Sequence, residues 1–507
     1  MNILDFFFGA PASDWIKFAL FFLGIFTFIF IAEKTRSALG WPAEVNRKLV
    51  HIATGVLIFF CAFLFESQTP LVWMAILFVI INFAGVQSGA LKGMHGTARH
   101  TYGTVYYPLT FLILVLTCWE NHKTILMMSM LILAISDAVA AIVGENLKKP
   151  HEYILMRDRK SIEGSAAMFL ATVLLCILVL PHIAYLDNLT FPWWRVLWIG
   201  IIVGAVATAL EALSSAGSDN LTAPLGAAYM MSQMIAQPTI QNLQITQGFG
   251  LALLVAWLSV RAGFLSASGG VATFLLGTLI FGIGGWAWTV PILTFFIISS
   301  LLSKIGKTKK DKLDYEKSGQ RDVFQVWANG GPAGLAVIGY TFFPDPVWYA
   351  LFIGSVAAVN ADTWATEVGV FSQFKPRSIL NLKVVEHGTS GGITPLGTFA
   401  SLAGSALIFL SGWIIAPFLL QIALHDAMIW IIIGAGFAAS LFDSVLGATI
   451  QAQYRCAKCG KITEKQIHCE QPTTLASGWR WLNNDGVNAL SALFAMLIVW
   501  IGWVLTH

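Results

Sequence analysis

Long apolar segments separated by short polar loops run along most of the 507-residue chain. A helix of about 20 apolar residues is long enough to cross the hydrocarbon core of a bilayer. The pattern therefore predicts an all-α, polytopic membrane protein with about 14–16 transmembrane helices in two half-domains. Sixteen spans are predicted, near residues 15–32, 49–65, 71–87, 105–118, 124–143, 166–180, 196–213, 223–236, 248–262, 268–284, 286–302, 322–343, 347–369, 393–415, 428–450 and 487–505.

Composition supports the membrane assignment and limits the choice of partners. Hydrophobic residues make up 57% of the chain and charged residues only 11%, whereas a soluble protein carries about 25% charged residues. The net charge of +3 gives the chain no general basic character. We therefore expect the lipid bilayer as a partner and no nucleic acid.

Basic residues gather in alternate loops, and this distribution predicts a topology. Lys and Arg favour the cytoplasmic side of short loops. Sixteen spans with both termini outside place every basic loop in the cytoplasm, which would be the cytoplasmic side of the cell membrane in a prokaryote. The polar, uncharged segment 238–247 separates the predicted domains, 1–240 and 248–507. Residues 307–320 form a charged linker within the second domain, and Lys92 and Arg99 form part of a basic loop in the first.

Four acidic residues lie inside apolar segments, where an ionisable side chain is costly and marks a candidate functional site. They are Asp137, Glu211, Asp362 and Asp443. Asp137 and Asp362 are each followed by a basic loop and by a hydroxyl- and glycine-rich turn into the next apolar segment. This repeated arrangement suggests two active sites. The alternative is that helix ends in any membrane protein collect Gly, Ser and Asp.

The side chains of the first half suit phosphoryl transfer. Arg47, Lys48 and His51 share one helical face at the start of the second span, although the two cations alone are also typical of interfacial anchoring. Carboxylates suit Mg²⁺, and cations suit phosphate oxygens. Phosphoryl transfer needs mainly positioning and charge neutralisation. No Walker-type loop or kinase-like HRD or DFG set is present, so a nucleotide site would be of another type.

The first half resembles the dolichol kinase and phytol kinase family, which is related to the CDP-diacylglycerol synthases. The resemblance covers roughly residues 30–236. Its motifs are Arg47-Lys48-x-x-His51, Tyr102-Gly103-Thr104-x-Tyr106-Tyr107-Pro108, Ser136-Asp137-Ala138-x-Ala140, Lys160-Ser161-x-Glu163-Gly164-Ser165 and Asp219-Asn220-Leu221-Thr222-x-Pro224.

That resemblance implies a membrane kinase that phosphorylates an isoprenoid alcohol, typically from CTP with a divalent cation such as Mg²⁺. Asp137 and Asp219 would hold metal or assist the attacking hydroxyl, while Lys160 and Arg47 would meet phosphates. The full set of predicted site residues in this half is Asp137, Lys160 and Asp219 (catalytic), Arg47, Lys48, His51, Ser161, Glu163 and Asn220 (substrate or nucleotide), and Asp137 and Glu145 (metal).

The second half, from about residue 250 to 505, resembles the phytyl-phosphate kinase and transmembrane protein 19 (DUF92) family. Its motifs are Arg321-Asp322-x-x-Gln325-Val326-x-Ala328-Asn329-Gly330-Gly331, Asp362-Thr363-x-Ala365-Thr366-Glu367-x-Gly369, Gly388-Thr389-Ser390-Gly391-Gly392 and Asn484-Asp485-x-Val487-Asn488. The two halves in series would convert an alcohol of the phytol or geranylgeraniol type into its monophosphate and then its diphosphate. The predicted site residues are Asp362 and Asp485 (catalytic), Arg321, Gln325, Asn329, Thr366, Thr389, Ser390 and Asn488 (substrate or nucleotide), and Asp362 and Glu367 (metal).

A polar loop near the C-terminus holds a separate candidate metal site. Cys456-x-x-Cys459-Gly460, with His468 and Cys469, resembles half of a zinc ribbon. No second C-x-x-C follows, and adjacent His468 and Cys469 would bind one Zn²⁺ only if the backbone turned sharply between them. A thiol pair or a purely structural loop is the alternative.

Two other functions fit parts of the pattern. Repeats, intramembrane acids and Gly-interrupted helices are also features of transporters, but transport sites lie near the bilayer midplane, whereas these motifs cluster on one face. A nucleotidyltransferase that forms a CDP-lipid would differ in which phosphorus is attacked and would release pyrophosphate.

Overall fold

The structure is a computed structural model that describes residues 9–88, 101–236, 239–305, 320–420 and 426–506. The chain folds into two compact units, residues 1–239 and 240–507. This division falls at the start of the polar segment 238–247. Lys92, Arg99 and almost all of the charged linker 307–320 lie outside the described residues.

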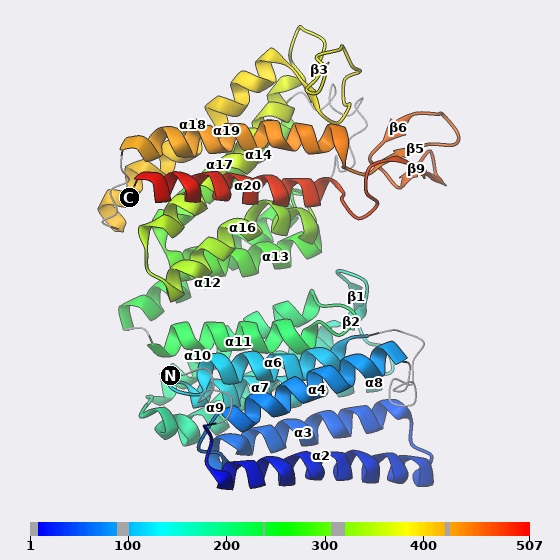
Figure 1. The fold of residues 1–507 in the computed structure, drawn as a ribbon, viewed down its shortest axis with the longest axis vertical. Coiled ribbons are helices and arrows are strands. Elements are labelled where there is room, and N and C mark those ends of the chain that lie inside the picture. Colours follow the sequence, from blue (N-terminus) through cyan, green and yellow to red (C-terminus); the bar gives the residue numbers. More distant parts are fainter. Residues whose placement is uncertain (1–8, 89–100, 237–238, 306–319, 421–425, 507) are drawn as a thin grey trace. The chain divides into compact units, whose positions relative to one another are not determined.

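Unit 1 is a bundle of helices with one small hairpin (Figure 1). Its elements are α2 (Ala12–Leu39), α3 (Ala43–Leu64), α4 (Thr69–Ser88), α6 (Gly103–Cys118), α7 (Lys123–Leu131), the π-helical turn η1 (Ile132–Ser136), α8 (Asp137–Asn146), β1 (Glu152–Ile154), β2 (Arg159–Ser161), α9 (Ile162–Ile183), the 3₁₀ turn η2 (Ala184–Asp187), α10 (Trp193–Ala212) and α11 (Asp219–Ala236).

Unit 2 is also helical, with short strands confined to two loops. Its elements are α12 (Thr239–Arg261), α13 (Ala267–Gly277), the π-helical turn η3 (Thr278–Gly284), α14 (Trp286–Lys304), α16 (Val323–Phe342), α17 (Pro346–Gly369), β3 (Arg377–Ser378), β4 (Gly392–Ile393), α18 (Pro395–Leu419), α19 (Asp426–Thr449), β5 (Gln453–Arg455), β6 (Ile462–Thr463), β7 (Ile467–His468), β8 (Gln471–Pro472), β9 (Thr474–Ser477) and α20 (Asn484–Thr506).

Each of the sixteen predicted spans coincides with a helical segment, which confirms the all-α, multi-pass architecture. Within the described part of the chain, twelve helices are long and apolar enough to cross a membrane by length and composition. The other four segments are α6, which is shorter, and α11, α16 and α17, which are long enough but less apolar. The reason for α17 is the polar set Asn360, Asp362, Thr363 and Glu367 at its end, which belongs to the site described below.

One helix in each unit is buried on all sides. In unit 1, every residue from Thr124 to Ala134 in α7 and η1 is buried among α3, α6, α9 and α11. In unit 2, every residue of α17 from Tyr349 to Ala361 is buried among α14, α16, α18, α19 and α20. A helix that is apolar all round is typical of such a central position. Each central helix leads directly into an acid, Asp137 in unit 1 and Asp362 in unit 2.

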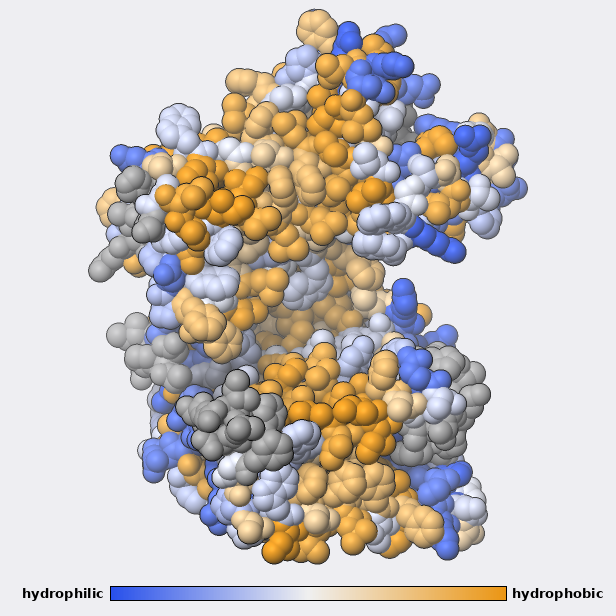
Figure 2. All heavy atoms as spheres, viewed as in Figure 1, coloured by the Kyte–Doolittle hydropathy of each residue, from blue (hydrophilic) through white to orange (hydrophobic). Residues whose placement is uncertain are grey.

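The outer helices expose large apolar side chains, as lipid-facing surfaces do. Leu20, Phe30, Ile80, Trp430 and Leu505 are each more than half exposed. Exposed apolar area on this scale is rare in soluble proteins and marks an interaction surface. Figure 2 shows hydrophobic side chains along the helices of each unit and hydrophilic side chains on the loop that carries β5, β6 and β9.

The strands form small antiparallel pairs in the loops. β1 pairs with β2, β3 with β4, and β7 with β8, while β5 lies between β6 and β9. Side-chain caps fix the helix starts that follow some of these loops: Ser161 accepts a hydrogen bond from the Gly164 N–H at the start of α9, and Thr394 accepts one from Gly397 at the start of α18.

Candidate active sites

In unit 1, Asp137 follows a break in the regular helix. The π-helical turn η1 precedes it, and Asp137 is the first residue of α8. Such turns inside α-helices are frequent at functional sites because they alter which side chains face a neighbour. Ser136 on this turn hydrogen bonds Thr172 of α9 at 3.0 Å between the two hydroxyl oxygens, which fixes the turn against the next helix.

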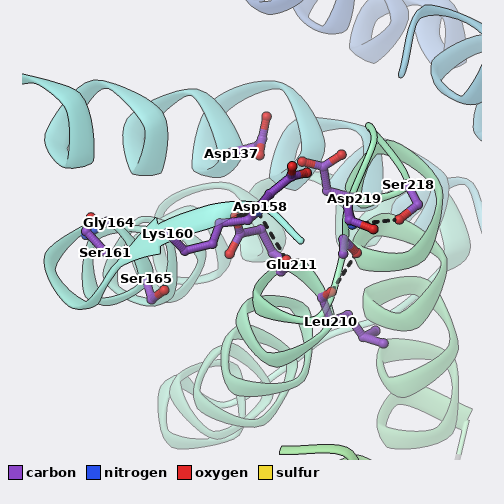
Figure 3. Close-up of polar contacts among 12 residues, drawn as sticks. Asp137, Asp158, Lys160, Ser161, Gly164, Ser165, Leu210, Glu211, Ser218 and Asp219 are labelled. Carbon is purple, nitrogen blue, oxygen red and sulfur yellow. Dashed lines mark hydrogen bonds and ion pairs between the residues drawn. The ribbon is translucent and has the colours of Figure 1, made fainter. Parts of the chain in front are cut away.

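Three acids from three helices meet at this point (Figure 3). One carboxylate oxygen each of Asp137, Glu211 and Asp219 lies within 4.8 Å of the others. Glu211 is in the last turn of α10, and Asp219 is the first residue of α11, where the helix dipole favours a negative charge. Clustered carboxylate oxygens are the donor set that Mg²⁺ prefers.

Lys160 supplies a positive charge to the same cluster. Its ammonium group forms an ion pair with the Glu211 carboxylate and donates a hydrogen bond to the Glu211 backbone carbonyl at 3.2 Å. Burial alone would lower the pKa of Lys160, but the charges of Glu211, Asp219 and Asp137 outweigh it and raise the pKa. Lys160 therefore stays charged at neutral pH, as phosphate binding requires.

His51 lies beside Asp137, and Tyr107 packs against His51. The His51 Nε2 lies 3.9 Å from the Asp137 Oδ2 and 2.9 Å from the Leu133 carbonyl oxygen on the π-helical turn. The His51 ring packs edge-on against the Tyr107 ring, with 4.8 Å between the centroids. The structure thus brings His51, Asp137, Lys160 and Asp219 together.

Other predicted residues of this half have partners outside the acid cluster. Arg47 pairs with Glu44 at 3.2 Å, and Lys48 pairs with Glu145. Glu163 pairs with His151 at 2.6 Å, between Oε1 and Nδ1. The acids clustered with Asp137 are Glu211 and Asp219, whereas Glu145, predicted as a metal ligand beside Asp137, pairs with Lys48.

Asn220 holds two loops of unit 1 together. The side-chain NH₂ of Asn220 donates to the Gly103 backbone carbonyl at 3.1 Å, and the backbone carbonyl of Asn220 accepts from the Thr110 hydroxyl at 2.7 Å. Gly217 packs directly on Gly103, where a Cβ would lie 2.6 Å from the Gly103 nitrogen, and its φ of +85° also favours glycine. The Tyr-Gly-Thr run and the turn before Asp219 are therefore a single structural unit.

We expect Lys160→Met to destabilise unit 1 by about 3 kcal/mol, because it leaves the buried Glu211 carboxylate without its cation. Replacing both partners, in Lys160→Met/Glu211→Leu, is expected to recover most of that loss. Denaturant unfolding in detergent micelles, followed by tryptophan fluorescence, measures both effects. A double variant no more stable than the single one would show that the pair does not set the stability of this region.

In unit 2, Asp362 and Asp443 line a small pocket of about 20 Å³ at the end of the central helix α17. Asn329 of α16 and Asn488 of α20 also line it and hydrogen bond each other at 3.3 Å. Ser491 of α20 donates to the Asp443 Oδ2 at 3.2 Å. Four helices therefore contribute to one acidic, amide-lined pocket.

A third acid near these two comes from a loop and does not line the pocket. Glu464, just after β6, accepts a hydrogen bond from the Ser390 hydroxyl at 2.7 Å and lies close enough to Asp362 and Asp443 for their charges to interact. Burial, with the neighbouring Asp485 charge, raises the pKa of Glu464. Ser390 belongs to the glycine-rich loop 388–392, so this hydrogen bond joins that loop to the loop between α19 and α20.

A larger apolar cavity of about 110 Å³ lies beside α16. Its walls come from α12, α13, η3 and α14, and its polar lining includes Arg321, Gln325 and Asn329. Asn329 lines both the cavity and the acidic pocket. Burial lowers the pKa of Arg321, although the Glu367 charge opposes this effect. An apolar cavity with a cation at its polar wall suits an amphipathic anion.

Three further predicted residues of unit 2 lie in α20, in α17 and in the loop 388–392. Asp485 is buried in the first turn of α20. Thr366 is exposed on α17, one turn beyond Asp362, and Thr389 lies in the loop 388–392, where its carbonyl accepts from the Gly392 N–H at 3.0 Å. Neither threonine lines the acidic pocket.

Several residues that contribute to the two sites are not among the site residues assigned from the sequence motifs. Glu211 and Asp443 stand out in the sequence only as acids in apolar segments. Ser491 and Glu464 carry no comparable signal, because one is a serine in an apolar helix and the other an acid in a charged loop. Only the fold brings them to Asp443 and Ser390.

The loop between α19 and α20 brings its cysteines together. Cys456, Cys459, His468 and Cys469 each place one ligand atom within 4.8 Å of the others. Hydrogen bonds from the backbone of Cys459 and from the His468 side chain lower the pKa of Cys456 to about 6. The thiolate is the form of cysteine that binds metals.

Sequence comparisons place the chain in a family. Residues 250–496 match the family described as integral membrane protein DUF92. Protein PGR of Arabidopsis thaliana is 35% identical over 276 residues, which cover 50% of this chain and 94% of that protein. The chain belongs to the DUF92 family of integral membrane proteins.

This DUF92 protein is also similar to a phytol kinase of Synechocystis, with 31% identity over 201 residues that cover 37% of this chain and 78% of that protein. An uncharacterised membrane protein of Methanocaldococcus jannaschii is 30% identical over 203 residues, which cover 39% of this chain and 79% of that protein. No solved structure matches. Similarity to the DUF92 family and to phytol kinases, both expected from the motifs, is thus confirmed.

Proposed function

We propose that this DUF92 protein is a bifunctional membrane kinase that converts an isoprenoid alcohol into its monophosphate and then its diphosphate. Unit 1 performs the first step and unit 2 the second, so that the chain is a fusion of a phytol kinase-like half with a DUF92 half. The observation that carries the proposal is the pair of acidic sites, each at the end of a buried central helix, in a chain similar to phytol kinases.

In the first step, the alcohol oxygen forms a bond to the γ-phosphorus of CTP, the bond to the bridging oxygen breaks, and CDP leaves. In this proposal Lys160, which pairs with Glu211 in the structure, binds phosphate oxygens, and Asp137 or Asp219 accepts the hydroxyl proton. Asp137, Glu211 and Asp219 have the donor chemistry to hold Mg²⁺, which would neutralise phosphate charge. The choice of CTP as phosphoryl donor and of Mg²⁺ as cation rests on the resemblance of the motifs to the dolichol kinase and phytol kinase family.

In the second step, a phosphate oxygen of the monophosphate forms a bond to the γ-phosphorus of a second CTP, the bond to the bridging oxygen breaks, and CDP leaves. The apolar cavity supports an isoprenoid tail as occupant of unit 2, because its walls are hydrophobic over most of their surface. Arg321 lies on that wall and suits the phosphate of the same molecule. Asn329, which also lines the pocket of Asp362 and Asp443, connects the tail region to the acids.

The test is product analysis by mass spectrometry with the full chain in lipid nanodiscs, phytol or geranylgeraniol, CTP and Mg²⁺. The expected products are the monophosphate, the diphosphate and CDP. Release of pyrophosphate with a CDP-lipid would instead identify a cytidylyltransferase. Absence of phosphorylated products with several chain lengths and all four nucleoside triphosphates would overturn the proposal.

Val255→Trp is expected to raise the KM of unit 2 for geranylgeranyl monophosphate about tenfold, because the indole fills the cavity that we assign to the tail. The matched control is Leu254→Trp, whose side chain is 49% exposed on the outside of the same helix. Initial rates with added monophosphate measure both. Equal KM values in the two variants would exclude this cavity as the tail site.

A further inference from the structure

Two short hairpin turns face each other in the loop between α19 and α20. The first joins β5 to β6 and holds Cys456, Cys459 and Gly460; its Cys456 N–H donates to the Lys461 carbonyl at 3.0 Å and its Gly460 N–H to the Cys456 carbonyl at 2.9 Å. Gly460 has a φ of +74°, which glycine adopts without strain. The second turn joins β7 to β8 and holds His468 and Cys469.

The backbone turns sharply in the second turn, although the sequence there has no obvious turn signal. Cys469 and Glu470 have φ values of +51° and +64°. Two consecutive residues with positive φ form the tight turn typical of two-residue hairpins. As a result, adjacent His468 and Cys469 both direct a ligand atom to the same point.

Two sulfur–nitrogen distances in this group are close to those around one tetrahedral metal ion. The Cys459 sulfur lies 3.6 Å from the His468 Nδ1, and the Cys469 sulfur lies 3.2 Å from the same nitrogen. With Zn–S bonds of about 2.3 Å and Zn–N bonds of about 2.0 Å, tetrahedral zinc separates its ligand atoms by about 3.5–3.8 Å. The three-sulfur, one-nitrogen donor set is also typical of zinc rather than of Mg²⁺ or Ca²⁺.

We propose that Cys456, Cys459, His468 and Cys469 bind one Zn²⁺ ion as a structural site. All four coordination positions come from side chains, which is typical of structural rather than catalytic zinc. The strands of this loop are only two to four residues long. Such short strands bury little apolar area, so a metal is the expected source of their stability.

The zinc site also determines where Glu464 lies. Glu464 is between the two zinc-binding turns, after β6 and before β7. Its contact with Ser390 and its proximity to Asp362 and Asp443 therefore depend on a loop that the metal holds together. Through this hydrogen bond, Glu464 connects the zinc-binding loop to the glycine-rich loop 388–392.

The test is the zinc content of the purified full-length protein, measured by inductively coupled plasma mass spectrometry. We expect about one zinc per chain. Cys459→Ser and Cys469→Ser are expected to lose most of it, while Cys118→Ser, at the end of α6, is expected to retain it. His468→Cys is expected to retain zinc through four thiolates, whereas His468→Ala is expected to lose it.

Alkylation provides a second readout that does not depend on activity or on how well each variant folds. Cys459 and Cys469 are exposed, yet bound zinc is expected to slow their reaction with iodoacetamide until a chelator is added. Equal zinc in native protein, Cys459→Ser and Cys469→Ser would overturn the proposal. So would a native chain that neither contains nor takes up zinc, or a disulfide between these cysteines in the freshly purified protein.

Discussion

Asp137→Asn is expected to reduce phosphorylation of the isoprenoid alcohol by about 10³-fold, because it removes charge and a proton acceptor at the reacting hydroxyl. The amide has nearly the shape of the carboxylate, so the packing of η1 and α8 should survive. The introduced amide would still meet Glu211 and Asp219 but would present one oxygen and one NH₂ group to them. Added isoprenyl monophosphate should still be converted to the diphosphate at the native rate.

Product analysis of the Asp137→Asn variant with alcohol alone, and separately with monophosphate alone, measures the two steps. The control is Asp187→Asn, because Asp187 accepts hydrogen bonds from the Lys123 and Thr124 N–H groups at the other end of the same helical segment. That variant should keep both steps. An Asp137→Asn enzyme with native alcohol kinase activity would remove Asp137 from the catalytic site.

Asp362→Asn is expected to stop the reaction at the monophosphate, with a loss of about 10³-fold in the second step. Asp362 lies with Asp443 in the pocket at the end of α17, and Glu464 adds a third acid nearby. Removing one of these negative charges lowers the affinity of the site for a divalent cation, including the cation that is bound to a nucleotide. Monophosphate should accumulate when the variant is supplied with alcohol.

The matched control for this variant is Asp345→Asn at the opposite end of α17. Asp345 caps the helix by accepting from the Val347 N–H at 2.8 Å, and asparagine caps helices equally well. A time course of alcohol, monophosphate and diphosphate distinguishes the variants. If Asp137→Asn and Asp362→Asn each slowed both steps equally, the two units would form one functional site and the sequential scheme would be wrong.

The comparison of the two acidic sites explains how far sequence alone could locate them. An acid in an apolar segment can be recognised from the sequence alone, because the free-energy cost of placing it in the membrane depends on the residues around it in that segment. Asp137, Glu211, Asp362 and Asp443 could be selected in this way. The sequence does not show which acids lie together. In the structure Asp137 lies with Glu211 and Asp219, and Asp362 lies with Asp443, at separations of 74 to 82 positions in the chain.

Local sequence patterns have less value in polar loops. Glu145 follows Asp137 by two helical turns, so the sequence suggests that the two acids bind one metal ion. In the structure Glu145 pairs with Lys48 of α3. Glu464 lies among other charged residues and gives no signal until Ser390 is seen to bind it. In such loops the partner of a charge is set by the packing of distant helices.

The sequence by itself determined the sixteen helical segments, because the length of an apolar run is a local property that the bilayer selects. It also determined the four ligand types in the cysteine loop. Only the tertiary structure decided which acids meet, which cation pairs with them, and that Cys469 and Glu470 turn the backbone far enough for His468 and Cys469 to share one ion. The physical reason is that these features depend on contacts between distant segments and on backbone dihedral angles, neither of which residue type and spacing specify.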